Sequence, residues 1–284
     1  MKANELYEKL DKDFDLEHLK DDWSFMDFNG YITPDFKKRY MGIMLNNTDQ
    51  IKKVYTAVFP DLVILQKLIE SEQTDILLFL HHAMGYDGKA EGFPFYNIPE
   101  YYLSKLKQQR ISLYVLHSPL DKNGEYSTSV SLANAVKLKI IDEFCNYEGY
   151  KIGVICTTQI KTASGLRDYI KPIIGHEIKL RAYGEDLIRK GQIAVAAGGG
   201  SYGFVAGELS ELGINMYITG FTRPISSFEP TMEFHRIAKE NKINVLGATH
   251  YTTEKYACMA MVGYFRKLGI QAEFLDGGFY LEDL

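Results

Sequence analysis

Histidine and acidic residues gather in three short segments of this sequence, and each segment follows a run of apolar residues. The segments are Leu80-His81-His82, His117-Ser-Pro-Leu-Asp121 and His250-Tyr-Thr-Thr-Glu254. Imidazole and carboxylate groups are common ligands of divalent transition metals. Because four of the seven histidines fall in these segments, the sequence predicts a metal site that is built from all three.

The adjacent histidines His81 and His82 suit two metal ions better than one. Neighbouring residues of an extended chain point to opposite faces, so each histidine can serve a different ion of a close pair. The simpler interpretation is a buried, hydrogen-bonded histidine beside an exposed one. For this segment alone, the two interpretations are about equally supported.

The second segment combines a carboxylate with a histidine. Asp121 is a hard oxygen donor that can bridge two cations. His117 can be a metal ligand, a residue that orients a ligand, or a proton carrier; we favour the proton carrier, which makes His117 the candidate catalytic residue. Taken alone, the segment is explained more simply by an aspartate that caps a turn and a histidine bonded to the backbone.

In the third segment, His250 and Glu254 are four residues apart and therefore share one face of a helix. Taken alone, a glutamate that complements the helix dipole is the simpler interpretation. Together, the segments supply five candidate metal ligands, namely His81, His82, Asp121, His250 and Glu254.

Five protein ligands leave open positions on two metal ions for water or substrate, as in a reactive site. Two such ions typically lie about 3.5–4 Å apart and share a water whose pKa they lower. The two acids offset only part of the charge of two divalent ions. We therefore expect the site to favour a small anionic substrate.

The secondary-structure elements that precede the three segments must position them. Apolar runs alternate with helical patterns along the chain, which is typical of an α/β fold. Expected strands are 41–45, 53–59, 75–80, 111–116, 151–156, 193–197, 215–219, 243–246 and 272–275. Expected helices are 60–72, 99–109, 128–144, 163–174, 228–240 and 252–268, with another after residue 203. The candidate ligands thus follow strands, and ligand crevices of α/β sheets form at the carboxyl ends of strands.

A glycine-rich turn, Gly198-Gly-Gly-Ser-Tyr-Gly203, follows one of these strands. Backbone N–H groups of such a turn can cradle a phosphate. The glycine spacing does not match G-x-G-x-x-G, and the next strand does not end in the acidic residue of a dinucleotide site. We favour close helix–strand packing as the reason for the glycines, and we assign no cofactor-binding residue here.

Composition limits the classes of function. The chain has 284 residues, of which 46% are hydrophobic and 24% charged, as in folded proteins of one or two domains. A net charge of −5 argues against nucleic acid as the main partner. The three cysteines, Cys145, Cys156 and Cys258, form no C-x-x-C pair and indicate a reducing compartment. Because neither a signal-like nor a membrane-length apolar run is present, we expect a cytoplasmic protein.

The order of the motifs resembles the Nif-three-like family, also called GTP cyclohydrolase 1 type 2 homologues. The motifs, between about Gly42 and Gly277, are the three segments above with Ala196-Ala-Gly-Gly-Gly-Ser201 and Tyr217-Ile-Thr-Gly220. The resemblance implies a dinuclear centre with the five ligands named above. Mixed imidazole and carboxylate donors favour Zn, Mn or Fe as the two divalent ions of each chain.

The resemblance also implies two similar α/β domains with mixed sheets flanked by helices, the first formed by both chain ends, and a homohexamer. We expect residues 1–125 with 243–284 to form the metal-binding domain and residues 126–242 the second domain. The chain departs from the family pattern at Phe221, where an acid is usual, and in the segments 83–86 and 247–249. These departures affect the cavity lining rather than the ligands.

The leading hypothesis is a metal-dependent hydrolase of a small phosphorylated or nucleotide-like compound. GTP cyclohydrolase-like activity is suggested by the resemblance alone. The alternative is a non-catalytic metal-binding scaffold or metal chaperone, which would use the same ligands. Metal content with turnover supports the first hypothesis, and metal content without turnover supports the second. A nicotinamide-dependent enzyme is disfavoured by the glycine spacing.

Overall fold

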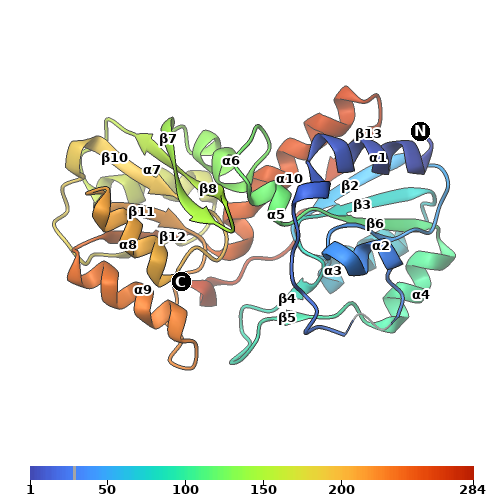
Figure 1. The fold of residues 1–284 in the computed structure, drawn as a ribbon, viewed down its shortest axis with the longest axis horizontal. Helices are drawn as coiled ribbons and strands as arrows, with labels where there is room; N and C mark the ends of the chain where they lie inside the picture. The colour runs from blue at the N-terminus through green and yellow to red at the C-terminus, as the bar shows by residue number, and fades with distance from the viewer. Residues whose placement is uncertain (28–29) are drawn as a thin grey trace. The chain divides into compact units, whose positions relative to one another are not determined.

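The computed structural model describes residues 1–27 and 30–284, and the chain divides into two compact units (Figure 1). Unit 1 consists of Met1–Asp121 with Cys258–Gly278, and unit 2 of Lys122–Ala257 with Phe279–Leu284. Each unit is built on its own mixed β-sheet with flanking helices, which confirms the α/β fold. Among the described residues, no helix is both long and apolar enough to cross a bilayer.

Unit 1 contains a five-stranded sheet with the order β1-β6-β3-β2-β13. Its strands are β1 (Gly42–Leu45), β2 (Lys53–Ala57), β3 (Ile76–Leu80), β6 (Ile111–Val115) and β13 (Gln271–Phe274). β1 is antiparallel to β6, and the other pairs are parallel. β3 is central and buried along its whole length, which explains its continuous apolar run, since both faces of the strand are covered.

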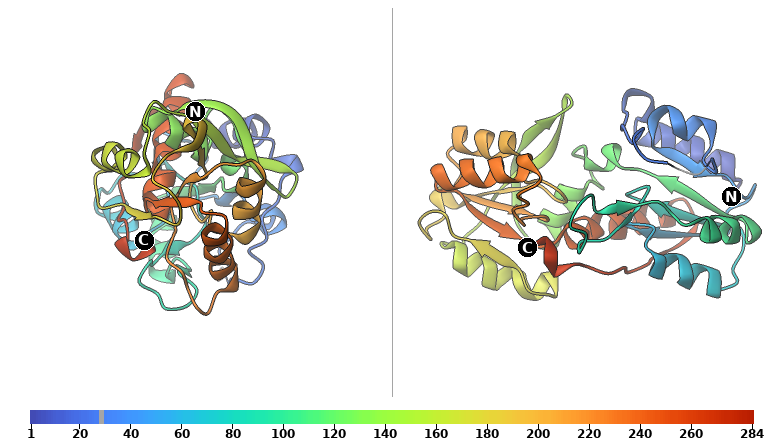
Figure 2. Two further views of the ribbon diagram at one scale, coloured as in Figure 1. Left: turned by 90° about the vertical axis from the view of Figure 1, so that its left-hand side faces the viewer. Right: turned by 90° about the horizontal axis from the view of Figure 1, so that it is seen from below.

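Helices cover both faces of this sheet (Figure 2). α3 (Leu62–Glu70) and α4 (Glu100–Gln108) share a core with the β3 residues Ile76, Leu78 and Leu80. α1 and the later turns of α10 contact the opposite face, where the rings of Phe265 and Tyr7 meet those of Phe79 and Tyr114. The further elements are α1 (Ala3–Asp13), η1 (Leu16–His18), α2 (Pro34–Arg39), β4 (Gly85–Tyr86), β5 (Phe95–Tyr96), α5 (Ser118–Asp121) and α10 (His250–Lys267).

Unit 2 contains a six-stranded sheet with the order β7-β8-β10-β11-β12-β9. Its strands are β7 (Lys139–Tyr147), β8 (Tyr150–Thr157), β9 (Lys179–Arg181), β10 (Gln192–Val195), β11 (Met216–Thr219) and β12 (Asn244–Gly247). β10, β11 and β12 are mutually parallel, whereas the outer pairings are antiparallel.

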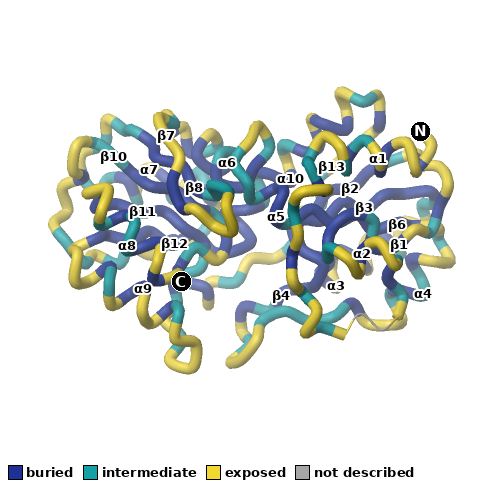
Figure 3. The backbone as a smooth tube through the Cα atoms, viewed as in Figure 1, coloured by how far each residue is buried: buried dark blue, intermediate teal, exposed yellow. Residues whose placement is uncertain are grey.

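Two apolar layers enclose the sheet of unit 2. Ile193 and Val195 of β10 pack with α6 and α7, and the intervening Ala194 packs with α8 and α9. This alternation follows from the two-residue period of a strand. Buried residues accordingly concentrate in the central strands β10, β11 and β12 (Figure 3). The flanking helices are α6 (Thr128–Ala135), α7 (Ala163–Ile174), α8 (Gly203–Glu211) and α9 (Glu229–Glu240), with short turns η2 (Arg189–Gly191) and η3 (Leu281–Asp283).

The segment 128–144, expected as one helix, is instead a helix followed by a strand, so that prediction was wrong. α6 ends at Ala135, Lys137 adopts the left-handed backbone conformation with a φ of 57°, and β7 begins at Lys139. β7 joins β8 through the turn Glu148-Gly149, where both φ values are positive, as in a type I′ hairpin turn. Pairing with β8 therefore decided the structure of this segment.

An ion network before β3 should give the fold an acid-sensitive contribution to stability. Asp75 accepts a hydrogen bond from Arg110 at 2.7 Å and pairs with Lys52 at 2.6 Å. Hydrogen bonds from these two cations hold the pKa of Asp75 well below its usual range, although burial opposes them. Such a carboxylate stabilises the folded state above its unfolded-state pKa of about 3.9, and the contribution is lost as the pH falls below that value.

We expect Asp75→Asn to lower the free energy of unfolding by about 1 kcal/mol at pH 7, because both cations are more than half exposed and solvent screens them. Asparagine tolerates the left-handed backbone of Asp75, so the change reports on charge. In urea denaturation the deficit relative to wild type should shrink at pH 3. Asp35→Asn, which breaks an exposed pair on α2, should have a clearly smaller effect than Asp75→Asn, because solvent screens this pair more fully. A deficit that is equal at both pH values would contradict the assignment.

Candidate metal centre

His81 and His82 lie where the central strand of unit 1 ends. The backbone ladder continues past β3, because His81 N–H donates to the carbonyl of Ala57 at 3.2 Å and His82 N–H to that of Val58 at 2.9 Å. Both histidines are buried. Their ring centroids are only 4.5 Å apart. The alternation of side chains between the two faces of an extended chain therefore stops at Leu80. The rings of His81 and His82 both reach the same region.

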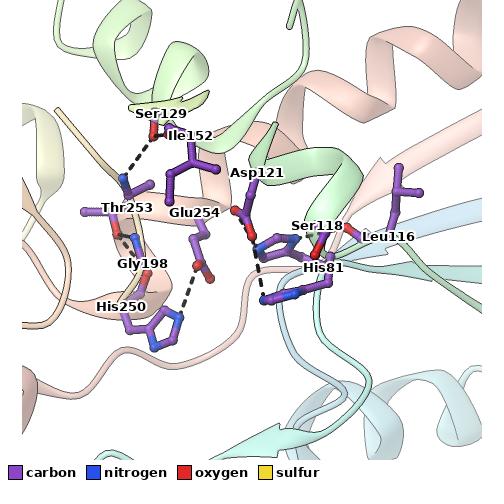
Figure 4. A network of polar contacts seen from close by, with 12 residues as sticks. His81, Leu116, Ser118, Asp121, Ser129, Ile152, Gly198, His250, Thr253 and Glu254 are labelled. Atoms are coloured by element: carbon purple, nitrogen blue, oxygen red, sulfur yellow. Dashed lines mark hydrogen bonds and ion pairs between the residues drawn. The ribbon is translucent and has the colours of Figure 1, made fainter. Parts of the chain in front are cut away.

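A backbone contact sets the tautomer of His81. Its Nδ1 lies 3.0 Å from the carbonyl oxygen of Leu116, and a carbonyl oxygen accepts only from a protonated nitrogen. Nε2 then carries the lone pair, which is the form of imidazole that binds a metal. The Nε2 atom lies 3.5 Å from Oδ1 of Asp121 (Figure 4).

β6 delivers the second candidate segment to the same edge of the sheet. β6 and β3 are parallel neighbours with Leu80 opposite Val115, as a shared centre requires, and Leu116 N–H extends the ladder by donating to the carbonyl of Leu80 at 2.9 Å. The chain then turns into α5, whose last residue is Asp121. Oδ2 of Asp121 lies 3.7 Å from Nε2 of His117.

Three histidines of unit 1 thus come together at this edge. One ring nitrogen from each of His81, His82 and His117 lies within 4.8 Å of the other two. Imidazole nitrogens at this spacing can hold a metal ion. His117 therefore meets the geometry of a ligand as well as that of a proton carrier beside the ligands.

The N-terminal segment contributes an acid that the sequence patterns did not identify. Asp21 is buried, and its Oδ1 accepts hydrogen bonds from Nδ1 of His117 at 3.1 Å and from the hydroxyl of Ser118. Burial raises the pKa of Asp21, but the charge of His117 and the hydrogen bonds outweigh burial and place the pKa below its ordinary value. Asp21 precedes His117 by 96 residues and follows no strand, so no local signal could have revealed it.

Aromatic rings surround the histidines of unit 1. Phe59 stacks on His82 with the ring centroids 4.4 Å apart, and Tyr86 stacks on Phe59 at 5.0 Å. Trp23 places its ring edge-on to His117 at 5.6 Å. Because such a wall excludes water and lowers the local dielectric constant, it strengthens the interaction of the site with charge.

In unit 2, His250 and Glu254 occupy the first two turns of α10. His250 N–H donates to Oδ2 of the buried Asp283 at 2.9 Å, so a carboxylate caps the positive end of the helix. Oε1 of Glu254 lies 3.1 Å from Nε2 of His250 (Figure 4). Both side chains are buried, and they share one helix face, as the four-residue spacing predicts.

The glycine-rich turn closes over this pair within unit 2. Thr253 Oγ1 accepts a hydrogen bond from Gly198 N–H at 2.9 Å and donates to the carbonyl of Thr249 at 3.0 Å. A Cβ at Gly198 would lie 2.1 Å from Oε1 of Glu254 and 3.4 Å from Nε2 of His250. The φ of Gly198, +69°, also disfavours any other residue. Close approach to the candidate ligands accounts for this glycine.

The other histidines have different surroundings. His18 is exposed and pairs with Asp15. His176 Nε2 lies 2.8 Å from the hydroxyl of Thr252. Burial lowers the pKa of His235 to about 4. Within the described part of the chain, none of these three joins a group of side chains that could hold a metal ion.

The candidate donors of both units are side chains of the kinds that bind metal ions. Unit 1 offers imidazole nitrogens and a carboxylate, and unit 2 offers one of each. Such mixed sets suit zinc, manganese and iron. Buried histidine and glutamate side chains of this chain can therefore hold a metal ion, in agreement with the coarse expectation from the sequence.

The sequence has relatives that share most of its length. Residues 33–276 match the family described as Duf34/NIF3 (NGG1p interacting factor 3). A protein of Archaeoglobus fulgidus named GTP cyclohydrolase 1 type 2 homolog is 30% identical over 238 residues, which cover 83% of this chain and 88% of that protein. A protein of the same name from Deinococcus radiodurans is 27% identical over 241 residues, which cover 83% and 84%.

Solved structures show the same fold. The protein titled "protein ybgI, unknown function" superposes with a TM-score of 0.75 at 19% identity, over 98% of this chain and 99% of that one. TTHA1606 from Thermus thermophilus gives a TM-score of 0.68 at 23% identity, with coverage of 98% and 99%. The family match spans far more than half of the chain, and the order of the histidine and glycine motifs agrees with it: this chain belongs to the Duf34/NIF3 family.

Proposed function

We propose that this protein binds a pair of divalent metal ions and hydrolyses a small phosphorylated or nucleotide-like compound at them. The observation that carries the proposal is the approach of one ring nitrogen each from His81, His82 and His117 to within 4.8 Å at the carboxyl ends of β3 and β6. The name of these relatives, GTP cyclohydrolase 1 type 2 homolog, supports a nucleotide-like substrate.

The proposed centre has the five ligands that the sequence motifs supply. The ligands are His81, His82 and Asp121 of unit 1 with His250 and Glu254 of unit 2. These five protein ligands leave positions open on two ions that each need about four donors. The unit 2 ligands lie in the first turns of α10, and the later turns of this helix belong to unit 1, where Sγ of Cys258 donates to the carbonyl of Ala57 at 3.3 Å.

Each residue of the centre has a distinct task. His81 is oriented by its backbone contact so that Nε2 is the metal-binding atom. Asp121 has one oxygen toward His81 and the other toward His117, so it would offer a hard oxygen donor beside both histidines. When bound, divalent ions supply Lewis acidity and make a water acidic enough to lose its proton near neutral pH.

His117 is the proposed proton carrier. Asp21 engages its Nδ1, so that Nε2 can take a proton from the attacking water and return it to the leaving group. Two divalent ions with two carboxylate ligands leave the centre with net positive charge. That charge favours a phosphate group in the substrate over a neutral one.

Metal content tests the ligand assignment. Protein purified without chelator should carry about two transition-metal ions per chain by elemental analysis. Asp121→Ala and Glu254→Ala should each lose at least about half of this metal, because the remaining histidines must then hold cations that repel one another. Met259→Ala, at an exposed position of α10, should keep the full content. Protein that neither carries metal nor takes up zinc on titration would refute the proposal.

Adjacent glycines of the turn after β10 provide a sharper contrast. Gly198→Ala should displace the Glu254 carboxylate, since the new Cβ would lie 2.1 Å from its Oε1, and metal content should fall as it does in Glu254→Ala. Gly199→Ala is the matched control, because a Cβ at Gly199 meets no atom within 4 Å. Circular dichroism should show both variants folded. Equal metal content in the two variants would remove Gly198 from the support of the site.

His117→Ala separates three roles in one experiment. For a proton carrier, metal content stays near that of wild type and the hydrolysis of a phosphate ester such as p-nitrophenyl phosphate falls by about 10²–10⁴-fold. This is the outcome we expect. Loss of metal would instead make His117 a ligand, and unchanged rate with unchanged metal would make it structural. His18→Ala, which changes an exposed histidine, controls for non-specific effects. Wild-type protein that carries metal but hydrolyses no phosphate ester would favour a metal-binding scaffold.

A further inference from the structure

Four aromatic residues of unit 1, which we call the aromatic rim, contact one another: Trp23 and Phe95 are half-buried against the core, and Phe25 and Phe93 are exposed. Phe25 is 63% exposed and Phe93 is 53% exposed, and their rings meet edge to face at 5.5 Å. Large apolar rings that gather in water are typical of binding surfaces rather than of inert ones. The exposed rings of Phe25 and Phe93 are therefore a candidate binding surface.

The rim is continuous with the histidines of the candidate metal centre. Phe95 lies 5.6 Å from His82, and Trp23 lies 5.6 Å from His117, measured between ring centroids. Trp23 and Phe95 also contact one another at 5.5 Å. A molecule held by these histidines would therefore lie close to the aromatic rings of Trp23 and Phe95.

Polar anchors fix the two chain segments that carry the rim. In the first, the buried Asp21 binds Ser118 and His117. In the second, the buried Asp61 accepts the N–H of Tyr86 at 3.1 Å at the base of the β4–β5 hairpin. The rings are consequently presented from fixed bases, which reduces the entropy lost when a ligand binds.

We propose that the aromatic rim is a subsite that stacks a planar aromatic or heteroaromatic ring of the substrate. The inference rests on the proposed function, because it requires an anionic group of the same substrate to reach the metal centre. Stacked and edge-to-face contacts between aromatic rings need no hydrogen bond. The rim can therefore accept any flat ring. The rim thus selects ring-bearing phosphates over aliphatic ones.

Trp23 is the single tryptophan of the chain, so its fluorescence reports directly on the rim. We would titrate zinc-loaded protein with adenosine 5′-monophosphate and, separately, with ribose 5-phosphate, which lacks the ring. The nucleotide should quench Trp23 with saturation. Ribose 5-phosphate should compete with it at least about tenfold more weakly, in line with the usual strength of base–aromatic stacking.

The double variant Phe25→Leu/Phe93→Leu should weaken nucleotide binding by about tenfold while the affinity for ribose 5-phosphate and the zinc content stay unchanged. Tyr101→Leu, at an exposed aromatic position on α4, is the matched control and should bind both compounds as wild type does. Calorimetry gives the same comparison without relying on Trp23.

Other outcomes overturn the inference in distinguishable ways. Equal affinity for the two phosphates removes the ring subsite but leaves a phosphate-binding metal centre. Zinc binding without binding of either phosphate removes the subsite as well. A double variant that changes the association state of the protein, with nucleotide affinity intact, assigns the rim to contacts between copies. Failure to bind zinc at all refutes the proposed function itself.

Discussion

The parallel, in-register pairing of β3 with β6 is the constraint on which the unit 1 site depends. Because Leu80 lies opposite Val115 and the ladder continues through Leu116, the residues that follow the two strands emerge at one edge of the sheet. A shift of one residue in either strand would invert its side chains and move His81 away from the α5 carboxylate. The apolar core of the sheet therefore does more than stabilise the fold, since it fixes the separation of the candidate ligands.

Residues distant in sequence supply hydrogen-bond partners for the histidines of the site. A buried histidine needs hydrogen-bond partners, and the carbonyl of Leu116 meets this need for His81 while selecting its metal-binding tautomer. The buried Asp21 does the same for Nδ1 of His117. In unit 2, Asp283 caps the helix at His250. For His81 and His117 a residue distant in sequence thus orients the ring, which is how protein sites usually tune metal ligands.

Much of the fold follows from local pattern. The continuous apolar runs that form β3 and β6 and the four-residue spacing of His250 and Glu254 are properties of short stretches, and the structure has them as expected. Prediction failed where pairing between distant segments decides whether a segment is a helix or a strand. The apolar residues Ile140, Ile141, Phe144 and Cys145 of β7 follow the helical spacing, yet pairing with β8 makes this segment a strand. The N-terminal helix α1 was not predicted, although Leu6 and Leu10 are buried on one face of it.

The sequence by itself determined which donor atoms are available and the order of the segments that carry them, because side-chain chemistry and strand or helix preference are local. The tertiary structure decided which atoms face one another. It turned the rings of His81 and His82 toward one region beyond the end of β3. It also placed Gly198 against Glu254 and Trp23 beside His117. These contacts join side chains whose positions depend on the packing of whole elements, and no local pattern encodes that packing.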